Sequence, residues 1–192
     1  LASADIPFSV STNNLSLSSG FAFQTLSGTN YTLDGNVTTV DAAQTWGGPV
    51  AMTGNAILAA GNGPIAINGA ISGATRNLTL NTSGNVTQSA AITVAGLELL
   101  GTGGTYTLNH GSNAITTLAG NTGAVSFTES NGFTVGTVNS TNGVTATGNL
   151  TLLGTGPVTV SKNVSSTAGG NILLAAQGVN YDAGLAINAS VT

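Results

Sequence analysis

Residues 147–174 read TGNLTLLGTGPVTVSKNVSSTAGGNILL, and residues 53–80 carry a second version, TGNAILAAGNGPIAINGAISGATRNLTL. The apolar positions coincide between the two copies, as in Gly63-Pro64-Ile65 and Gly156-Pro157-Val158, whereas the polar turn residues vary. A degenerate repeat of this kind is typical of a stacked, solenoid-like fold. The offset between the copies predicts about four coils of chain from one to the other.

A shorter repeat, Leu-Leu-Gly-Thr-Gly, begins at Leu99 and again at Leu152. The distance between these copies is not a clean multiple of one coil. We therefore expect coil lengths to vary, at the Gly-rich turns near residues 101–104 and 118–124.

Short segments with apolar residues at alternate positions recur along the whole chain. In Leu78-Thr79-Leu80 and Val158-Thr159-Val160, alternation points the apolar side chains inward and the threonine outward. The commonest residues are poor helix formers, and Gly-Asn, Ser-Gly, Thr-Gly-Gly and Asn-Gly turns lie between the segments. The sequence predicts an all-β fold, a right-handed parallel β-helix (β-solenoid). We expect about three short strands per coil and eight or nine coils, stacked ~4.8 Å apart.

Residues 1–192 are expected to form a single β-solenoid domain without an internal boundary. The first and last segments, residues 6–10 and 185–187, are as apolar as the middle ones. Because open coil ends invite strand addition, we expect a segment of a longer fibre or a subunit of a stacking filament. The register can be tested at one point: Leu150 and Ile172 should lie one rung apart on one face, with Lys162 outward.

The composition excludes several classes of protein. Only 4% of the residues are charged, and the two basic ones are Arg76 and Lys162, so no surface can track nucleic-acid phosphates. No stretch approaches the roughly 20 apolar residues of a membrane-spanning helix, so we expect no membrane insertion. The chain has no cysteine, which excludes disulfides and thiolate metal sites.

The sequence predicts no catalytic residue, no cofactor-binding residue, no metal ligand and no enzymatic activity. Glycan-active β-helix enzymes cluster aspartates with basic residues, whereas these acids are scattered. Asp34-Gly35-Asn36 is favoured as a turn over a carboxylate pair with Asp41, and the single histidine, His110, as a solvated turn residue. The six acids are Asp5, Asp34, Asp41, Glu98, Glu129 and Asp182.

The aromatic residues are favoured as core. Trp46 is expected to pack at a coil corner, in preference to forming an exposed platform for carbohydrate. Asparagines at equivalent turns are expected to form hydrogen-bonded ladders between coils. The phenylalanines expected in the core are Phe21, Phe23, Phe127 and Phe133.

The runs Gly120–Thr128, Gly132–Val138 and Gly143–Leu152, together with Trp46–Val50 and Gly61–Gly69, resemble the repetitive shaft of filamentous-haemagglutinin-like exoproteins. These are large bacterial adhesins secreted by the two-partner route. The resemblance covers roughly residues 30–190 and implies a secreted shaft. The family's secretion domain carries Asn-Pro-Asn-Gly, which is absent from this sequence.

The expected function is that of a structural or adhesive extracellular β-solenoid at a bacterial cell surface, without catalysis. Expected partners are further copies end to end or flanking repeats, and a host or environmental surface including its glycans. One alternative is an ice- or surface-binding solenoid that uses arrays of outward threonines. A further alternative is a polysaccharide-active enzyme. The outward threonines are Thr79, Thr93, Thr107, Thr151 and Thr159.

Overall fold

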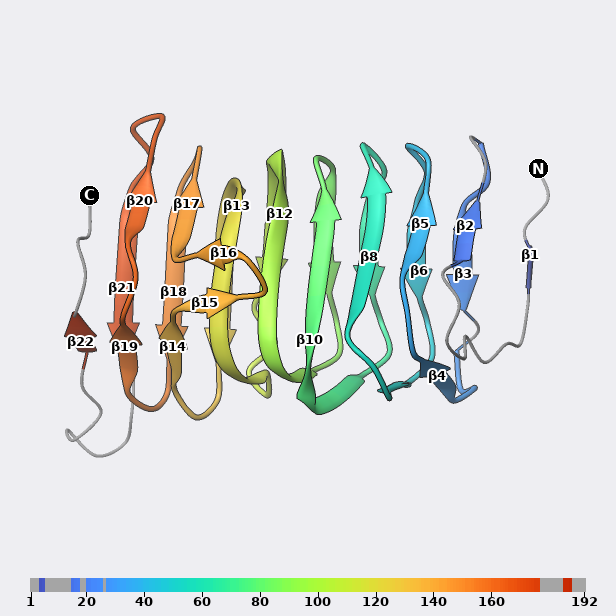
Figure 1. Cartoon of the computed structure of the whole chain (residues 1–192), viewed down its shortest axis with the longest axis horizontal. Coiled ribbons are helices and arrows are strands. Elements are labelled where there is room, and N and C mark those ends of the chain that lie inside the picture. The colour runs from blue at the N-terminus through green and yellow to red at the C-terminus, as the bar shows by residue number, and fades with distance from the viewer. Residues whose placement is uncertain (1–3, 6–14, 18–19, 26, 177–184, 188–192) are drawn as a thin grey trace.

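A computed structural model of the chain describes residues 4–5, 15–17, 20–25, 27–176 and 185–187. Within these ranges the chain forms strands and turns without a helix, and the strands stack in parallel as a β-solenoid of about eight turns (Figure 1). The parallel β-helix predicted from the repeats is confirmed. The predicted first segment, residues 6–10, and Asp182 lie outside the described residues.

Three stacks of strands, called sheets 1, 2 and 3, form the sides of the solenoid. Each strand pairs with its equivalent one turn further on, so that Gln44 pairs with Ile65 and Leu150 with Ile172. The long strands β10, β12 and β13 continue around corners and contribute to more than one sheet.

Sheet 1 contains, in spatial order, β2 (Leu15–Leu17), β5 (Val37–Thr39), β8 (Ala56–Gly61), the second half of β10 (Ile71–Thr82), the middle of β12 (Ile92–Leu108), the middle of β13 (Ala114–Glu129), β17 (Val144–Ala146) and β20 (Val164–Ser166).

Sheet 2 contains β1 (Ala4–Asp5), β3 (Phe23–Thr25), β6 (Gln44–Trp46), β9 (Ile65–Ile67), β11 (Asn85–Gln88), the last parts of β12 and β13, β18 (Leu150–Gly154) and β21 (Ile172–Ala176).

Sheet 3 contains β4 (Tyr31–Leu33), β7 (Val50–Met52), the first parts of β10, β12 and β13, β14 (Phe133–Val135), β19 (Val158–Val160) and β22 (Leu185–Ile187).

The core fills the space between the sheets with the inward residue of each alternating pair. Leu150 lies directly below Ile172, one rung apart, and Lys162 is exposed, as the register predicted. Trp46 is buried within β6, with its ring centroid 4.7 Å from that of Phe23. The core placement predicted for Phe21 is wrong: its side chain is 44% exposed, because it lies ahead of β3.

The long repeat does not return to the same side of the solenoid. β8 belongs to sheet 1, whereas its counterpart β18 belongs to sheet 2, and β9 of sheet 2 likewise corresponds to β19 of sheet 3. Successive partners of Leu58 are Leu80, Leu99, Gly120 and Val144. The offset is therefore four coils plus one further side, which agrees with the predicted length of about four coils, and the change of side is the part that the repeat does not predict.

Coil length changes where the sequence predicted and also where it did not. Gly101 pairs with Thr122, and Thr105 pairs with Ala124. The corner of β12 between Gly101 and Thr105 therefore holds two more residues than the corresponding corner of β13 between Thr122 and Ala124. This confirms the Gly-rich turns as sites of variation. One unpredicted change is a short antiparallel hairpin, β15 (Thr137–Val138) with β16 (Thr141–Asn142), which projects from the coil between Gly136 and Gly143.

Side chains at the corners link successive coils. Three asparagines accept a hydrogen bond through Oδ1 from a backbone N–H group one turn further on, with distances of 2.8–2.9 Å. They are Asn36, Asn55 and Asn149. The predicted ladders are therefore present as side-chain-to-backbone bonds at these corners. Bonds of this kind satisfy backbone donors that strand pairing leaves free at a corner.

Gly101 tests how closely consecutive corners pack. Its φ is +112°, and an added Cβ would lie 2.1 Å from the carbonyl oxygen of Thr82. Gly103 also has positive φ, +91°, but open space around it. We expect Gly101→Ala to lower the free energy of unfolding by about 2 kcal/mol and Gly103→Ala by about 1 kcal/mol. Equal losses in urea denaturation would show that close packing at this corner contributes nothing.

Candidate functional site

The β15–β16 hairpin is the main departure from the regular solenoid, and polar side chains gather beneath it. Figure 1 shows it crossing in front of β13 toward β12, and it contacts both strands. A backbone hydrogen bond from Gly143 to Gly136, 2.7 Å long, closes its base. The hairpin thus folds back over the outer surface of earlier coils.

Glu98 lies on the outer face of β12, under this hairpin, and is only 4% exposed. Its Oε2 accepts hydrogen bonds from Thr79 Oγ1 at 2.6 Å and from Asn139 Nδ2 at 2.7 Å. Its Oε1 accepts one from Thr141 Oγ1 at 2.6 Å. A buried carboxylate is thus held by three neutral donors, two of which belong to the hairpin.

Asn139, at the tip of the hairpin, joins two further groups to this cluster. Its Nδ2 also lies 3.2 Å from Thr79 Oγ1, and its Oδ1 accepts a hydrogen bond from Asn77 Nδ2 at 3.0 Å. Its φ of 52° lies in the left-handed region, which asparagine tolerates in turns. We call Asn77, Thr79, Glu98, Asn139 and Thr141 the Glu98 cluster.

The sequence predicts the outward direction of Thr79 but not its burial, and it predicts no role for Glu98. Thr79 is an outward candidate of the surface-binding alternative, yet its side chain is only 2% exposed because the hairpin covers it. The one available signal was spacing. Val125 and Leu150 are paired although 25 residues apart, so this coil is longer than its neighbours and must contain an insertion.

Glu129 is a second buried acid, with 0% exposure, and it faces the interior of the solenoid at the end of β13. Its Oε2 accepts hydrogen bonds from the backbone N–H groups of Asn131, at 2.6 Å, and Gly132. Its Oε1 has no hydrogen-bond partner among the described residues. The carboxylate therefore closes the turn leading to β14 with one of its two oxygens.

Two substitutions of Glu129 distinguish the contribution of its hydrogen bonds to stability from the contribution of its charge. Glu129→Gln keeps one oxygen for both N–H donors and removes a buried charge, so the free energy of unfolding should stay within about 1 kcal/mol of the parent. Glu129→Ala leaves both donors without an acceptor and should lower it by about 2 kcal/mol. Urea denaturation compares the two. If glutamine destabilises as much as alanine, the charge itself stabilises the turn.

The remaining sequence candidates are not brought together. His110 occupies the predicted turn, between β12 and β13, where its Nδ1 accepts a hydrogen bond from the backbone N–H of Ser112. Asp34 and Asp41 lie at the two ends of β5, in the turns before and after it. In the described part of the chain, no three His, Asp or Glu side chains lie close enough to hold a metal ion.

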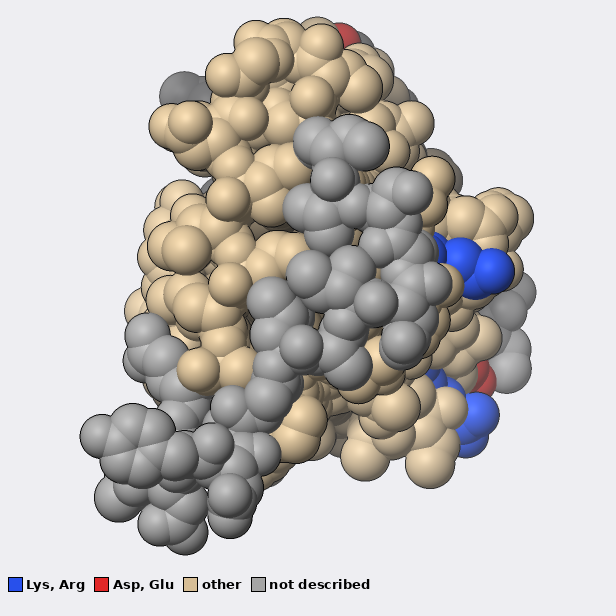
Figure 2. All heavy atoms as spheres, turned by 90° about the vertical axis from the view of Figure 1, so that its left-hand side faces the viewer, with Lys and Arg blue, Asp and Glu red and all other residues tan. Residues whose placement is uncertain are grey.

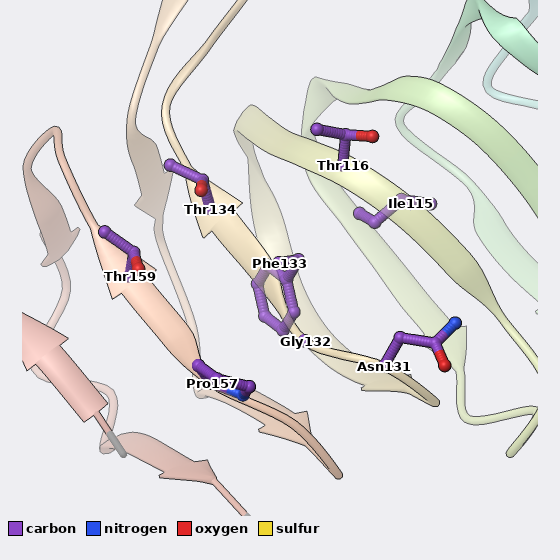
Figure 3. Close-up of a pocket in the computed structure, with 8 residues that line it drawn as sticks. All are labelled: Ile115, Thr116, Asn131, Gly132, Phe133, Thr134, Pro157 and Thr159. Carbon is purple, nitrogen blue, oxygen red and sulfur yellow. The ribbon is translucent and has the colours of Figure 1, made fainter. Parts of the chain in front are cut away.

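A hollow of about 310 Å³ opens where β13 and β14 separate (Figure 3). These strands pair only at Thr117–Thr134 and Leu118–Val135, so the preceding residues diverge. The residues lining the hollow carry no charge, and Phe133 is only 4% exposed there because its ring packs edge-on against Phe127 in the core. The lining residues are Ile115, Thr116, Asn131, Gly132, Phe133, Thr134, Pro157 and Thr159.

The outward threonines do not form the single array of the surface-binding alternative. Thr93 and Thr159 belong to sheet 3, Thr79 to sheet 1, and Thr107 and Thr151 to sheet 2. Sheet 2 nevertheless has an outward row of small residues, one per rung and about 4.8 Å apart. The row contains Thr45, Ala66, Thr87, Thr107, Ser126 and Thr151.

Charged side chains are sparse on the surface. The sequence contains two basic residues, and in the view along the solenoid from its C-terminal side the basic side chains, drawn in blue, lie on one flank (Figure 2). The described residues include no helix long and apolar enough to cross a membrane.

Comparison with known proteins finds one family profile that is similar to part of the chain. A family profile described as "Repeats of unknown function (DUF5649)" matches residues 66–120, from β9 to the middle of β13. No curated protein and no solved structure matches the chain. The match agrees with the repetitive architecture, and the resemblance to filamentous-haemagglutinin-like exoproteins stays a prediction.

Proposed function

We propose that this chain is a stiff, non-catalytic shaft segment of a bacterial surface protein, which displays or spaces binding elements outside the cell. The observation that supports this most is the continuity of the stack. One core runs through successive coils from Phe23 to Val164, and backbone pairing joins each coil to the next. Such a stack resists bending because every rung is bonded to both neighbours.

Two further features support the proposal. The corner asparagines and threonines add hydrogen bonds between rungs, such as Thr122 Oγ1 to the carbonyl of Gly101 at 2.8 Å. The outer faces consist largely of small, uncharged residues, which suit a spacer that meets other shafts or a surface without strong electrostatic selectivity. The proposed location is the cell surface, reached by secretion, as the resemblance implies.

Rigidity can be measured because the chain has no cysteine of its own. Thr38 and Ser165 lie in the same outward row of sheet 1, joined by the pairs through Ala59, Asn81, Leu100, Asn121 and Thr145. With donor and acceptor dyes on Thr38→Cys and Ser165→Cys, we expect one narrow distance near ~30 Å. This distance should hold under tension applied along the solenoid. A broad distribution, or gradual extension at low force, would exclude a rigid shaft.

The row of small residues on sheet 2 favours a second candidate, the binding of an ordered surface such as ice. Its members repeat at the rung spacing and carry no charge. A dilute solution should then show thermal hysteresis, and Thr107→Lys should remove it. A parent protein without thermal hysteresis would eliminate ice as the surface and leave the shaft proposal unaffected.

A further inference from the structure

The Glu98 cluster contains the three groups needed for an acyl transfer: a hydroxyl, a carboxylate and a carboxamide. Thr79 Oγ1 donates to Glu98 Oε2 at 2.6 Å, which is the geometry of a nucleophile with its general base. Asn139 Nδ2 donates a hydrogen bond to Thr79 Oγ1 at 3.2 Å, which places the carboxamide of Asn139 beside the hydroxyl oxygen. These groups come from three different coils.

We propose that Thr79 and Asn139 become joined by an ester bond that the chain forms itself, with Glu98 as the base. The proposal concerns one self-modification in each molecule. It involves no external substrate and no turnover, and it does not depend on the proposed shaft function.

The reaction balances without any other reactant. Glu98 Oε2 takes the hydroxyl proton as Thr79 Oγ1 attacks Cγ of Asn139, giving a tetrahedral intermediate with a negative Oδ1. The Cγ–Nδ2 bond then breaks, and Glu98 returns the proton to the leaving nitrogen, to which it is already hydrogen-bonded at 2.7 Å. The products are the Thr79–Asn139 ester and ammonia. The carboxylate is restored.

The neighbouring groups suit each stage of this step. Asn77 Nδ2 donates to Asn139 Oδ1 at 3.0 Å, the position at which negative charge develops, and so acts as an oxyanion donor. Thr141 holds the other oxygen of Glu98 and is a positioning residue. Thr79 and Glu98 are 2% and 4% exposed, which limits competition from water at the nucleophile and base.

Glu129 provides an internal comparison. It is also buried, but the hydrogen bonds that it accepts from the described residues come from backbone N–H groups alone, and its Oε1 accepts none from them. Burial of an acid in this fold therefore does not by itself assemble such a constellation. The Glu98 cluster requires the hairpin.

The bond would fasten the hairpin to β10 across the intervening strand β12. It would close a covalent loop between positions 60 residues apart in the sequence. Such a link prevents the coils between Thr79 and Asn139 from being pulled fully apart. Its mechanical effect resembles that of a disulfide, in a chain that has no cysteine.

Mass spectrometry tests the proposal on the intact, purified chain after incubation at neutral pH. We expect a mass about 17 Da below that of the sequence, the loss of one ammonia. Cleavage after glutamate cuts at Glu98 and Glu129, the only two glutamates, and separates Thr79 in residues 1–98 from Asn139 in residues 130–192. The ester should keep these two fragments joined, and mild alkali should release them.

Variants distinguish the ester from other losses of ammonia. Thr79→Val keeps the side-chain shape without the nucleophile and should show the full mass and separate fragments. Glu98→Gln should also keep the full mass, and Asn77→Ala should slow the reaction at least tenfold. Asn139 could instead lose ammonia to its own backbone, but that product persists in Thr79→Val and joins no fragments. A parent of full mass, or a mass loss unchanged in Thr79→Val, would overturn the proposal, whatever the stability of the variants.

Discussion

Substitution of Asn113 is expected to cause the largest loss of stability of any position considered, on the order of 4 kcal/mol for Asn113→Ala. Asn113 is 0% exposed and lies at the corner before β13. Its Oδ1 accepts from the Gln88 side chain at 2.6 Å and from the backbone N–H of Ile92 at 2.9 Å. Its Nδ2 faces Gln88 Oε1 and the carbonyls of Leu108 and Thr128, at 3.0–3.1 Å. Truncation of this side chain therefore leaves buried donors and acceptors in several coils without their hydrogen-bond partner.

Two further variants sharpen the test. Asn113→Asp keeps the acceptor but turns an oxygen toward three other oxygens, so it should destabilise at least as much as alanine. Asn121→Ala removes the same atoms from an exposed position on β13 and should change stability by less than about 0.5 kcal/mol. Chemical denaturation measures all three. A loss below about 1 kcal/mol for Asn113→Ala would mean that solvent replaces these hydrogen bonds.

Tyr106 should make stability fall steeply in alkaline solution. The side chain is buried, and its Oη lies 3.1–3.2 Å from the carbonyl oxygens of Leu80 and Thr82 and also contacts that of Leu100. Burial raises the pKa of Tyr106 to about 12, and hydrogen bonds with the Thr82 backbone, the Thr122 side chain and the Leu100 backbone offset part of this rise. The neutral phenol is therefore favoured in the folded state.

The sign of the pH dependence follows from that raised pKa. The contribution is fully present below pH ~10, where Tyr106 is neutral in both states, and is lost as pH rises through about 12 because only the unfolded phenol ionises readily. The loss should reach about 1.4 kcal/mol at pH 11 and approach about 2.7 kcal/mol well above pH 12.

Tyr106→Phe is the matched control, because it keeps the ring and removes the ionisable group. The two proteins should be compared by urea denaturation from pH 8 to pH 12. The stability of the parent should fall relative to that of the variant across this range, since the other titrating groups are shared. Parallel curves would show that the phenol ionises as easily when folded as when unfolded.

The strands and the core could be predicted from the sequence because alternation is a local property. Each short segment of the type Val158-Thr159-Val160 specifies two inward side chains and one outward side chain, and the structure follows it. Pairing of Leu150 with Ile172 followed from the spacing of apolar pairs within a single coil. Both are decided by residues close together in the chain.

The repeats misled about which side of the solenoid a strand occupies. β8 and β18 share a sequence pattern yet lie in different sheets. A strand-and-turn unit with alternating burial can serve on any of the three sides, because the same inward pair and outward residue are needed on each. The side is set by the accumulated lengths of all preceding turns, including insertions elsewhere in the chain.

The Glu98 cluster could not be predicted from the sequence for a related reason. Thr79, Glu98 and Asn139 are far apart in the sequence. The residues next to each of them in the chain indicate only an ordinary outward or turn position. What buries them together is the β15–β16 hairpin, which folds back over coils that precede it by several turns. Local alternation gave no indication that this outer face would be covered.

The sequence alone therefore determined the all-β, stacked architecture, the inward and outward residues of nearly every strand, and the sparse charge of the surface. Only the tertiary structure decided which side each repeat occupies, how Asn113 and Tyr106 find buried partners, and how Glu98 meets Thr79 and Asn139. The features that the sequence determined depend on residues that are close to one another in the chain. The features that the tertiary structure decided depend on contacts between coils, and the register of the coils is set by the lengths of many turns together.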